Sequence, residues 1–231
     1  MSKYETLLFD FGGTLDADGV PWMERFYEHY CAEGLTMSVE AFAPFFYRAD
    51  DQLVGTIPRE ADLSATVAKL ISNLEAELDR EKAGDVARAR RAAVRFLAAT
   101  NFIRNRPLLE RLSQRYRLGI VSNFYGNLEA VCEGVGLAPL FGVLVDSQRV
   151  GAEKPDPAIF RAALEPLGAV PERTLFIGDS LRRDREGARR LGMDFVWVAS
   201  AGAQQAETRS RGAALDHPAV TRLIDLGALL L

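Results

Sequence analysis

The spacing of apolar residues divides the chain into three parts. A short apolar run, Leu7 to Phe9, has the length of a strand buried on both faces, and the acidic Asp10 follows it directly. From there to about residue 105 the apolar positions recur at three- and four-residue spacing, without a strand pattern. From Pro107 onward, short apolar runs alternate with helical patterns. Strands that alternate with helices predict a parallel sheet with helices on both faces, the doubly wound α/β class.

Four helices are predicted in the middle part of the chain. The third of them has the clearest apolar stripe, and Asp62 is placed to cap its first turn. Because no strand pattern interrupts these helices, we expect a helical insertion between the first and second strands. Residues 1–18 and 106–231 then form the core domain, and residues 19–105 form an inserted α-helical cap domain. The four helices are predicted between Pro21 and Gly34, and at Val39 to Gln52, Leu63 to Lys82 and Asp85 to Thr100.

The last part of the chain predicts the remaining strands and the helices that connect them. A Pro-rich loop, GAEKPDP, leads into one of these helices, and Asn127 is placed to cap another. A final helix, Ala219 to Leu226, has a weaker pattern than the others. The predicted strands are Leu118 to Ser122, Val143 to Val145, Thr174 to Ile177 and Asp194 to Val198, and the other helices are Leu108 to Tyr116, Leu128 to Val135, Ala158 to Leu167 and Asp184 to Leu191.

Composition narrows the class of protein. The 231 residues carry a formal net charge of -4 and no basic stripe with interleaved aromatic residues, so we expect no nucleic-acid partner. The apolar runs at both ends are too short for a signal peptide or a membrane span, so we expect no membrane attachment. Cys31 and Cys132 lie far apart and outside any metal-ligand spacing, which favours reduced thiols in a cytoplasmic protein. The aromatic residues of the predicted cap are compatible with a homodimer.

Polar side chains stand where the predicted strands end. Asp10 follows the first strand, and two glycines and a threonine come next in the sequence FDFGGT. Because ligands bind beyond the carboxyl ends of the strands in open α/β sheets, we expect such groups to face one crevice. Gly12 and Gly13 allow backbone N–H groups to converge on an anion. The polar groups at the later strand ends and loops are Ser122, Asn123, Lys154, Asp179 and Asp184.

The chemistry of these groups is complementary. Three carboxylates close together repel one another unless a cation lies among them, and oxygen ligands of this kind suit Mg²⁺. The hydroxyl groups of Thr14 and Ser122 and the ammonium group of Lys154 can contact phosphoryl oxygens. Flanked by a metal ion and a lysine, the Asp10 carboxylate can attack phosphorus and form an aspartyl-phosphate. The sequence therefore predicts phosphoryl transfer in this crevice.

The order of these motifs resembles that of the haloacid dehalogenase (HAD) superfamily. The first motif is Asp10 with Gly13, Thr14 and Leu15, and the second is Ser122. The resemblance spans about residues 5–200 and implies a Rossmann-like core with an inserted helical cap. The third motif is Lys154 within EKPDPAIF, and the fourth is GDSLRRD from Gly178 to Asp184.

The resemblance also implies a role for each motif residue. Asp10 is expected to be the nucleophile that attacks a small phosphorylated metabolite. The cap, from Trp22 to about Asn105, is expected to close over the site and to set the substrate specificity. The expected phosphate-binding residues are Thr14, Ser122, Asn123 and Lys154, and the expected Mg²⁺ ligands are Asp10, the Gly12 carbonyl, Asp179 and Asp184.

One position departs from the family pattern. Phosphatases of the family that the chain resembles have a second aspartate two residues after the nucleophile, which acts as general acid and then as general base. Here that position is Gly12. General acid–base catalysis typically contributes about a hundred- to ten-thousandfold in rate. Asp16 and Asp18 follow the first motif and Tyr125 follows Ser122 closely in sequence, but no pattern favours one of them as the substitute for the missing acid.

The glycine leaves several reactions open. We expect a Mg²⁺-dependent phosphatase that acts through an aspartyl-phosphate, and an acyl phosphate would need no acid because its leaving group needs no proton. Dehalogenases of the family also lack the second aspartate, but they need no metal. Phosphonatases use a lysine of the cap, and the predicted cap contains Lys69 and Lys82. The remaining alternative is a protein that binds a phosphorylated ligand or a partner protein without turnover.

Overall fold

A parallel sheet forms the centre of the core. The computed structural model describes residues 3–231. In that part of the chain, six parallel strands lie in the order β3-β2-β1-β4-β5-β6. The central strand β1 (Thr6–Phe9) lies between β2 (Arg117–Ser122) and β4 (Thr174–Gly178). This topology confirms the predicted doubly wound α/β class. The outer strands are β3 (Val143–Asp146), β5 (Asp194–Val198) and β6 (Ala219–Val220).

Helices cover both faces of the sheet, because successive side chains of a strand point to opposite faces. Leu7 and Phe9 belong to one apolar cluster, which includes residues of α5 and α6. Leu8 belongs to a second cluster with residues of α8 and α9. All three side chains are fully buried, which explains the unbroken apolar run of β1. These helices are α5 (Phe102–Ser113), α6 (Leu128–Gly134), α8 (Pro157–Leu164) and α9 (Glu186–Leu191).

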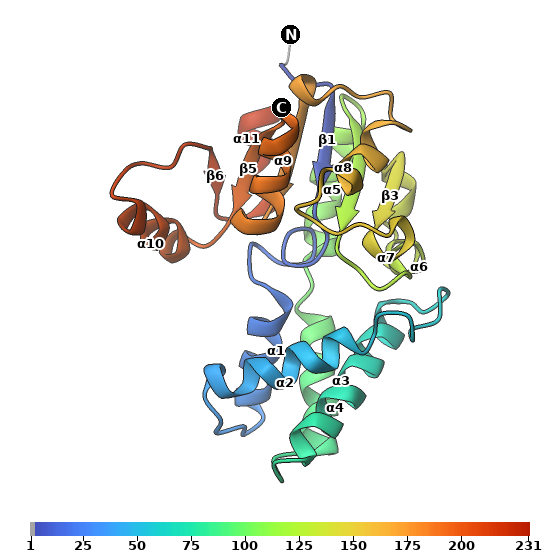
Figure 1. The fold of residues 1–231 in the computed structure, drawn as a ribbon, viewed down its shortest axis with the longest axis vertical. Coiled ribbons are helices and arrows are strands. Elements are labelled where there is room, and N and C mark those ends of the chain that lie inside the picture. The colour runs from blue at the N-terminus through green and yellow to red at the C-terminus, as the bar shows by residue number, and fades with distance from the viewer. Residues whose placement is uncertain (1–2) are drawn as a thin grey trace.

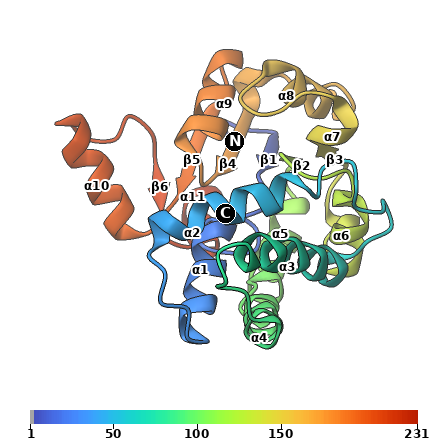
Figure 2. The same cartoon turned by 60° about the horizontal axis from the view of Figure 1, so that its bottom comes forward.

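Four helices from the middle of the chain form a separate layer, which we call the helical bundle. Figure 1 shows the bundle beyond the end of the sheet to which the strand arrows point. In Figure 2 the bundle comes forward, and α2 crosses in front of this end of the sheet. Asp62 accepts a hydrogen bond from the Ala65 N–H at 2.8 Å and so caps α3, as predicted. The bundle consists of α1 (Trp22–Ala32), α2 (Val39–Asp51), α3 (Leu63–Asp79) and α4 (Val86–Ala98).

Aromatic side chains fill the bundle and join it to the core. Phe26 of α1 stacks on Phe96 of α4, with ring centroids 4.2 Å apart. Trp22 packs edge-on against Phe96 at 5.2 Å and against Phe124, which follows β2, at 6.1 Å. Truncation of a buried aromatic side chain typically costs about 3–5 kcal/mol. The start of α1 is therefore fixed to both the bundle and the sheet end.

Helix α5 begins at Phe102, six residues before the predicted Leu108, and includes Pro107. The Asn105 side chain is fully buried and donates to the Leu15 carbonyl at 3.0 Å. The Asn101 N–H donates to the Asp16 carbonyl at 2.8 Å. These contacts with the loop after β1 order the first turn of α5, although Pro107 lacks one helical donor. Tertiary contacts thus outweigh the local proline signal.

The predicted helix at Ala219 to Leu226 is wrong. Its first two residues form β6, and Leu223–Leu226 is a short 3₁₀ turn (η4). The Trp197 N–H donates to the Pro218 carbonyl, and the Ala199 N–H donates to the Val220 carbonyl, both at 3.0 Å. The open edge of β5 therefore recruits this segment as a strand, because an edge offers unpaired backbone groups.

Helix α10 (Ala201–Arg211) is absent from the predicted elements. Ser200 caps it by accepting from the Ala203 N–H at 3.2 Å. None of its side chains is buried, so it has no apolar stripe from which it could be predicted. Two short helices, α7 (Ser147–Val150) and α11 (Gly227–Leu230), were also not predicted.

Asn127 occupies the predicted N-cap position of α6, but its side chain makes no capping hydrogen bond. Its Nδ2 atom donates instead to the Ala61 carbonyl at 2.8 Å and to the Thr66 hydroxyl at 2.7 Å. The Asp146 carboxylate takes over the role of the cap and accepts from the Leu128 N–H at 3.1 Å. Asn127 therefore joins the core to α3 of the bundle.

Across residues 3–231, no helix is both long and apolar enough to cross a membrane.

Candidate active site

Asp10 lies where β1 ends, beside Lys154. Its N–H continues the ladder to β4 by donating to the Ile177 carbonyl at 2.9 Å. Its Oδ1 atom lies 2.6 Å from Lys154 Nζ, and the same Nζ lies 2.7 Å from Asp184 Oδ1. All three side chains are buried. The structure therefore brings together three of the groups predicted to share one crevice.

Lys154 is held as a cation by this pair of carboxylates. Burial disfavours its charge, but the attraction of Asp10 and Asp184 outweighs burial and raises the pKa of Lys154 above its ordinary value. The Lys154 N–H donates to Asn123 Oδ1 at 2.8 Å, and Asn123 Nδ2 donates to the Lys154 carbonyl at 3.3 Å. Both ends of the Asn123 amide thus bind the backbone of the lysine loop, so this side chain positions Lys154.

Asp10, Asp179 and Asp184 form an acidic trio. One carboxylate oxygen from each lies within 4.8 Å of the others. Burial, followed by repulsion from Asp10 and Asp184, raises the pKa of Asp179 well above its usual range. Asp184 Oδ1 is buried without an aligned hydrogen bond, although Lys154 Nζ is close to it. Three converging carboxylates form a donor set that fits a hard cation.

A wide turn places Asp184. The turn, Leu181–Arg185 (η3), precedes α9 and directs the Asp184 N–H to the Ser180 carbonyl at 2.8 Å. In return, the Ser180 N–H donates to Asp184 Oδ2 at 2.9 Å. The predicted helix around Asp184 therefore begins about one turn earlier, and its wide first turn brings the carboxylate back to the end of β4.

The glycine turn after β1 allows close approach of Asp179. Gly13 has a φ of +87°, and a Cβ atom there would lie 2.5 Å from Asp179 Oδ2. Only glycine fits this position, because a side chain is excluded both by the conformation and by the carboxylate. The buried Thr14 hydroxyl lies 3.3 Å from Asp179 Oδ1, to which it donates. Thr14 is thus at the edge of the acidic trio.

Trp22 lies next to Gly12. Residue 12 is the position at which the family pattern has an acid. A Cβ atom at Gly12 would lie 3.3 Å from Trp22 Nε1. That indole nitrogen donates to Asp16 Oδ2 at 2.7 Å. The indole of α1 therefore limits the space for a side chain at residue 12.

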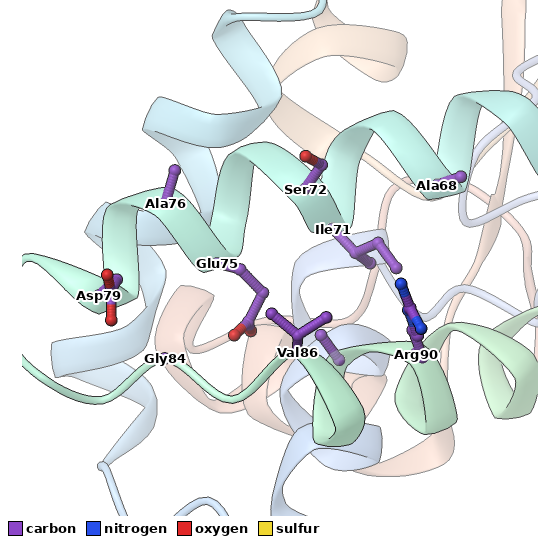
Figure 3. Close-up of a pocket in the computed structure, with 10 residues that line it drawn as sticks. Ala68, Ile71, Ser72, Glu75, Ala76, Asp79, Gly84, Val86 and Arg90 are labelled. Carbon is purple, nitrogen blue, oxygen red and sulfur yellow. The ribbon is translucent and has the colours of Figure 1, made fainter.

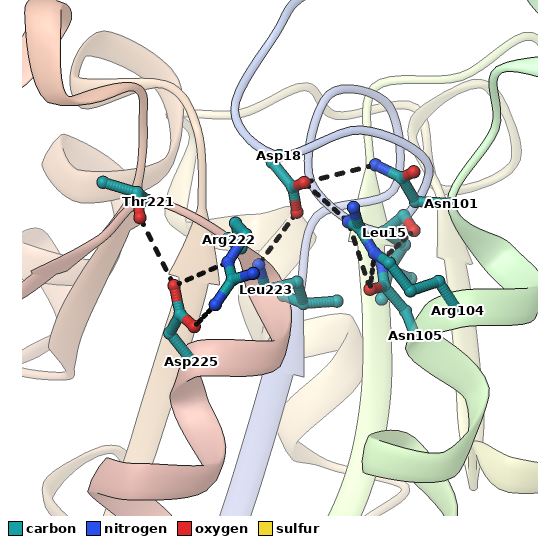
Figure 4. Close-up of polar contacts among 9 residues, drawn as sticks. All are labelled: Leu15, Asp18, Asn101, Arg104, Asn105, Thr221, Arg222, Leu223 and Asp225. Atoms are coloured by element: carbon teal, nitrogen blue, oxygen red, sulfur yellow. Dashed lines mark hydrogen bonds and ion pairs between the residues drawn. The ribbon is translucent and has the colours of Figure 1, made fainter.

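Asp16 and Asp18, the two acids that follow the first motif, are bound elsewhere. Asp16 is buried and accepts from the Gly13 N–H, from Trp22 Nε1 and from the Arg25 guanidinium at 2.6–2.7 Å. Figure 4 shows Asp18 in a separate network that joins the loop after β1 to α5 and η4. There it accepts from Arg104 at 2.6 Å and from the Leu223 N–H at 3.0 Å. Neither carboxylate lines the cavity of the site.

A cavity of about 120 Å³ lies between the sheet end and the helical bundle. Its sheet wall includes Asp10, Ser122 and Lys154. Its other wall comes from the bundle and from the loop after β2. The residues of this second wall include Trp22, Met23, Phe46, Tyr47, Asp50, Phe124 and Tyr125.

Sequence reasoning missed Asp50, which lines this cavity from the last turn of α2. The Tyr125 hydroxyl, from the loop after β2, donates to Asp50 Oδ1. Burial is the main reason why the pKa of Asp50 rises to about 6. Asp50 carried no signal in the sequence, because Asp50 and Asp51 together read as an ordinary polar helix end. Arg183, within the GDSLRRD motif, also lines the cavity and had no predicted role.

The two lysines of the predicted cap that a phosphonatase could use, Lys69 and Lys82, are both exposed and do not line the cavity.

A larger hollow of about 610 Å³ lies between α3 and α4, away from these groups (Figure 3). Its wall is largely apolar, with Ile71 and Val86 among the lining residues. Its buried carboxylate, Glu75, already accepts from the Tyr30 hydroxyl at 3.0 Å and from the Asp85 N–H at 2.5 Å. The acidic trio is absent from this hollow, so the smaller cavity is the candidate active site.

A family model for haloacid dehalogenase-like hydrolases matches residues 4–192. The chain therefore belongs to the haloacid dehalogenase-like hydrolase family, as the sequence motifs predicted.

Curated relatives match a part of the chain. Haloacid dehalogenase-like hydrolase domain-containing protein 3 of Bos taurus is 45% identical over 83 residues, which are 36% of this chain and 33% of that protein. Phosphoserine phosphatase of Thermus thermophilus is 45% identical over 65 residues, 28% of this chain and 26% of that enzyme. The matches thus span about a third or less of these relatives.

Solved structures match nearly the whole chain. A HAD phosphatase from Thermococcus onnurineus is similar with a TM-score of 0.58 and 24% identity, over 98% of this chain and 97% of that chain. The L-2-haloacid dehalogenase of Xanthobacter autotrophicus is similar with a TM-score of 0.62 and 18% identity, over 98% of each chain. At this level of identity the likeness shows a common fold.

Proposed function

We propose that this protein is a Mg²⁺-dependent phosphatase that hydrolyses a small phosphorylated metabolite through a phosphorylated Asp10. The observation that carries the proposal is the group at the sheet end. Asp10 lies 2.6 Å from Lys154 Nζ, within the acidic trio and on the wall of a small cavity. A nucleophilic carboxylate beside a lysine and a cation-binding set is suited to attack on phosphorus.

Each residue of the sheet wall has a role in this proposal. Asp10 attacks phosphorus in line with the leaving oxygen. Lys154 holds the Asp10 carboxylate in place and neutralises phosphoryl oxygens, and Asn123 fixes the lysine loop. Ser122 is a buried hydroxyl donor on the cavity wall for the phosphoryl oxygens, and Thr14, whose hydroxyl contacts Asp179 outside the cavity lining, is the second. The residues that would hold Mg²⁺ are Asp10, the Gly12 carbonyl, Asp179 and Asp184.

When bound, Mg²⁺ would stabilise negative charge on the phosphoryl oxygens. The helical bundle, within residues 19–105, is the cap in this proposal. It covers the cavity with a wall that includes Trp22 and Phe46. The small volume of about 120 Å³ favours a small leaving group. The similarity to phosphoserine phosphatase supports a substrate of this size.

The acidic trio favours a phosphatase over the two related reactions. A dehalogenase needs no cation, so three converging carboxylates would be an unexplained cost in that case. A phosphonatase needs a lysine from the cap at the site, and Lys69 and Lys82 are exposed outside the cavity.

A panel of small substrates tests the proposal. Acetyl phosphate, 4-nitrophenyl phosphate, O-phosphoserine and glycerol 3-phosphate are incubated with the protein and Mg²⁺, and phosphate release is measured. We expect turnover that is lost in EDTA and restored by Mg²⁺. In Asp10→Asn, kcat should fall by at least about ten thousandfold with an unchanged circular dichroism spectrum.

Two results would overturn the phosphatase. One is Asp10→Asn turnover close to that of the wild type. The other is a wild type that releases no phosphate from any member of the panel. Release of chloride from 2-chloropropionate in the latter case would favour the dehalogenase.

A further inference from the structure

The site lacks an acid at Gly12, yet its cavity has a carboxyl group on the opposite wall. Asp50 comes from the last turn of α2, and Asp10 comes from the end of β1. Both line the same cavity of about 120 Å³. In so small a space, one bound phosphate ester can contact both walls at once. Asp50 is therefore placed to reach the side of the ester that faces away from the sheet.

The contacts of Asp50 differ from those of the other carboxylates near Gly12. The Tyr125 hydroxyl donates to Oδ1 and fixes the side chain. Among the described residues, this is the hydrogen bond that fixes the carboxyl group, whose side chain lines the cavity. By contrast, Asp16 accepts hydrogen bonds from three donors on its two oxygens. Of Asp16, Asp18 and Asp50, Asp50 is the one that lines the cavity.

The surroundings of Asp50 favour a carboxyl group that exchanges its proton near neutral pH. Burial raises its pKa to about 6, and the neighbouring Asp51 acts in the same direction. The Tyr125 hydroxyl and the Arg183 guanidinium oppose this shift without cancelling it. A pKa near the working pH is the property that general acid–base catalysis requires.

We propose that Asp50 is the general acid and base of this site, supplied by the helical bundle in place of the acid missing at residue 12. This inference rests on the proposed phosphatase function. Tyr125 is a positioning residue, because its hydroxyl orients the carboxyl group and joins α2 to the core.

The proposed reaction has two balanced steps. First, an Asp10 oxygen bonds to phosphorus while the bond between phosphorus and the leaving oxygen breaks. Neutral Asp50 gives its proton to that oxygen, so an alcohol leaves and Asp50 becomes a carboxylate. Second, a water oxygen bonds to phosphorus while the bond to Asp10 breaks. Asp50 takes one proton from this water, which frees inorganic phosphate and restores both residues.

Asp50→Asn separates this role from a structural one through the leaving group. An alkoxide needs a proton to leave, whereas acetate leaves acetyl phosphate without one. We therefore expect kcat/KM for the best alkyl ester of the panel, O-phosphoserine or glycerol 3-phosphate, to fall about a hundred- to ten-thousandfold. The rate at which acetyl phosphate phosphorylates Asp10, measured by rapid quench, should stay within about threefold of the wild type. The later release of phosphate should become slow, which gives a burst of one acetate per site.

Matched variants control the measurement. Asp51→Asn changes the exposed neighbour at the same helix end and removes only a part of the Asp50 pKa shift, so its loss on alkyl esters should be far smaller than that of Asp50→Asn. Asp50→Glu should recover part of the alkyl ester activity, because it keeps the carboxyl group. Tyr125→Phe should lower kcat with little change in KM.

Three outcomes would overturn the role of Asp50. The first is an equal loss in the rate at which both kinds of substrate phosphorylate Asp10. The second is a rise in KM alone. The third is a wild-type protein that turns over acetyl phosphate but no alkyl ester. The first two assign Asp50 to packing or substrate binding, and the third means that no acid acts. A wild type that hydrolyses nothing and is never phosphorylated refutes the phosphatase itself, so the two failures are distinguishable.

Discussion

Two carboxylates lie where the helical bundle meets the core, and they differ in what binds them. Asp16, in the loop that leads from β1 to α1, accepts hydrogen bonds from a backbone N–H, an indole and a guanidinium, all within 2.7 Å. Asp50, at the end of α2, accepts from one neutral hydroxyl and faces the cavity. Burial raises the pKa of the first carboxyl group, and the donors that occupy both of its oxygens oppose that shift. The second lines the cavity, where it can exchange a proton. The hydrogen-bond partners of an aspartate, rather than the residue type, thus decide whether it stabilises the fold or is available for proton transfer.

The largest effect on the free energy of unfolding is expected when Asp16 is replaced. Arg25 is buried and stacks on the Phe96 ring at 4.1 Å, and its ionic partner is Asp16. Asp16→Asn removes the charge and leaves the guanidinium buried without a counter-ion. We expect the free energy of unfolding, from urea titration, to fall by about 3–5 kcal/mol.

A matched control is Asp18→Asn, two residues further on. Its ion pair with Arg104 is partly exposed, so the cost should be only about 1 kcal/mol. Equal costs for the two variants would mean that the buried pair has no special weight.

A smaller effect on the free energy of unfolding, of opposite sign, is expected when Asp50 is replaced. The pKa of Asp50 is about 6 in the folded protein, above its value in an unfolded chain. The contribution of Asp50 to stability is therefore fully present below the unfolded pKa and is lost as the pH rises through about 6. Asp50→Asn removes this loss. Relative to the wild type, the variant should gain on the order of 1 kcal/mol between pH 4 and pH 8, because the site is only half-buried.

Thermal unfolding at both pH values checks this prediction. Asp51→Asn is again the control, and because Asp51 contributes only part of the shift, its pH-dependent gain should be smaller than that of Asp50→Asn. A pH-independent difference between wild type and Asp50→Asn would contradict a raised pKa at Asp50.

The smallest effect is expected at Gly12. A Cβ atom there needs a shift of a few tenths of an ångström by the Trp22 indole. In the wild type, Gly12→Asp should change alkyl ester turnover by less than about tenfold, because Asp50 already supplies the proton. In an Asp50→Asn background, the same substitution should restore part of the lost turnover. A large gain in the wild-type background would show that Asp50 does not serve as the acid.

The sheet wall of the site could be predicted from the sequence, because its residues follow apolar runs that fix them to strand ends. Asp10 and Asp179 each follow an unbroken buried strand, and parallel strands bring such ends together. The helices of the bundle were also predictable from their apolar spacing, to within a few residues.

The bundle wall could not be predicted in the same way. Whether Asp50 faces solvent or the cavity depends on how α2 lies across the sheet end, and that depends on packing between distant segments. Its partner Tyr125 is 75 residues away in the chain. The same limit explains β6, whose strand conformation depends on the open edge of β5.

The phosphorylated state of Asp10 is the most direct test of the account. The protein is mixed with Mg²⁺ and acetyl phosphate, quenched in acid, digested and mapped by mass spectrometry. We predict one phosphoryl group on the peptide that contains Asp10, at higher occupancy in Asp50→Asn and absent in Asp10→Asn. Release of phosphate with no phosphoryl group on Asp10 in either the wild type or Asp50→Asn would contradict the account.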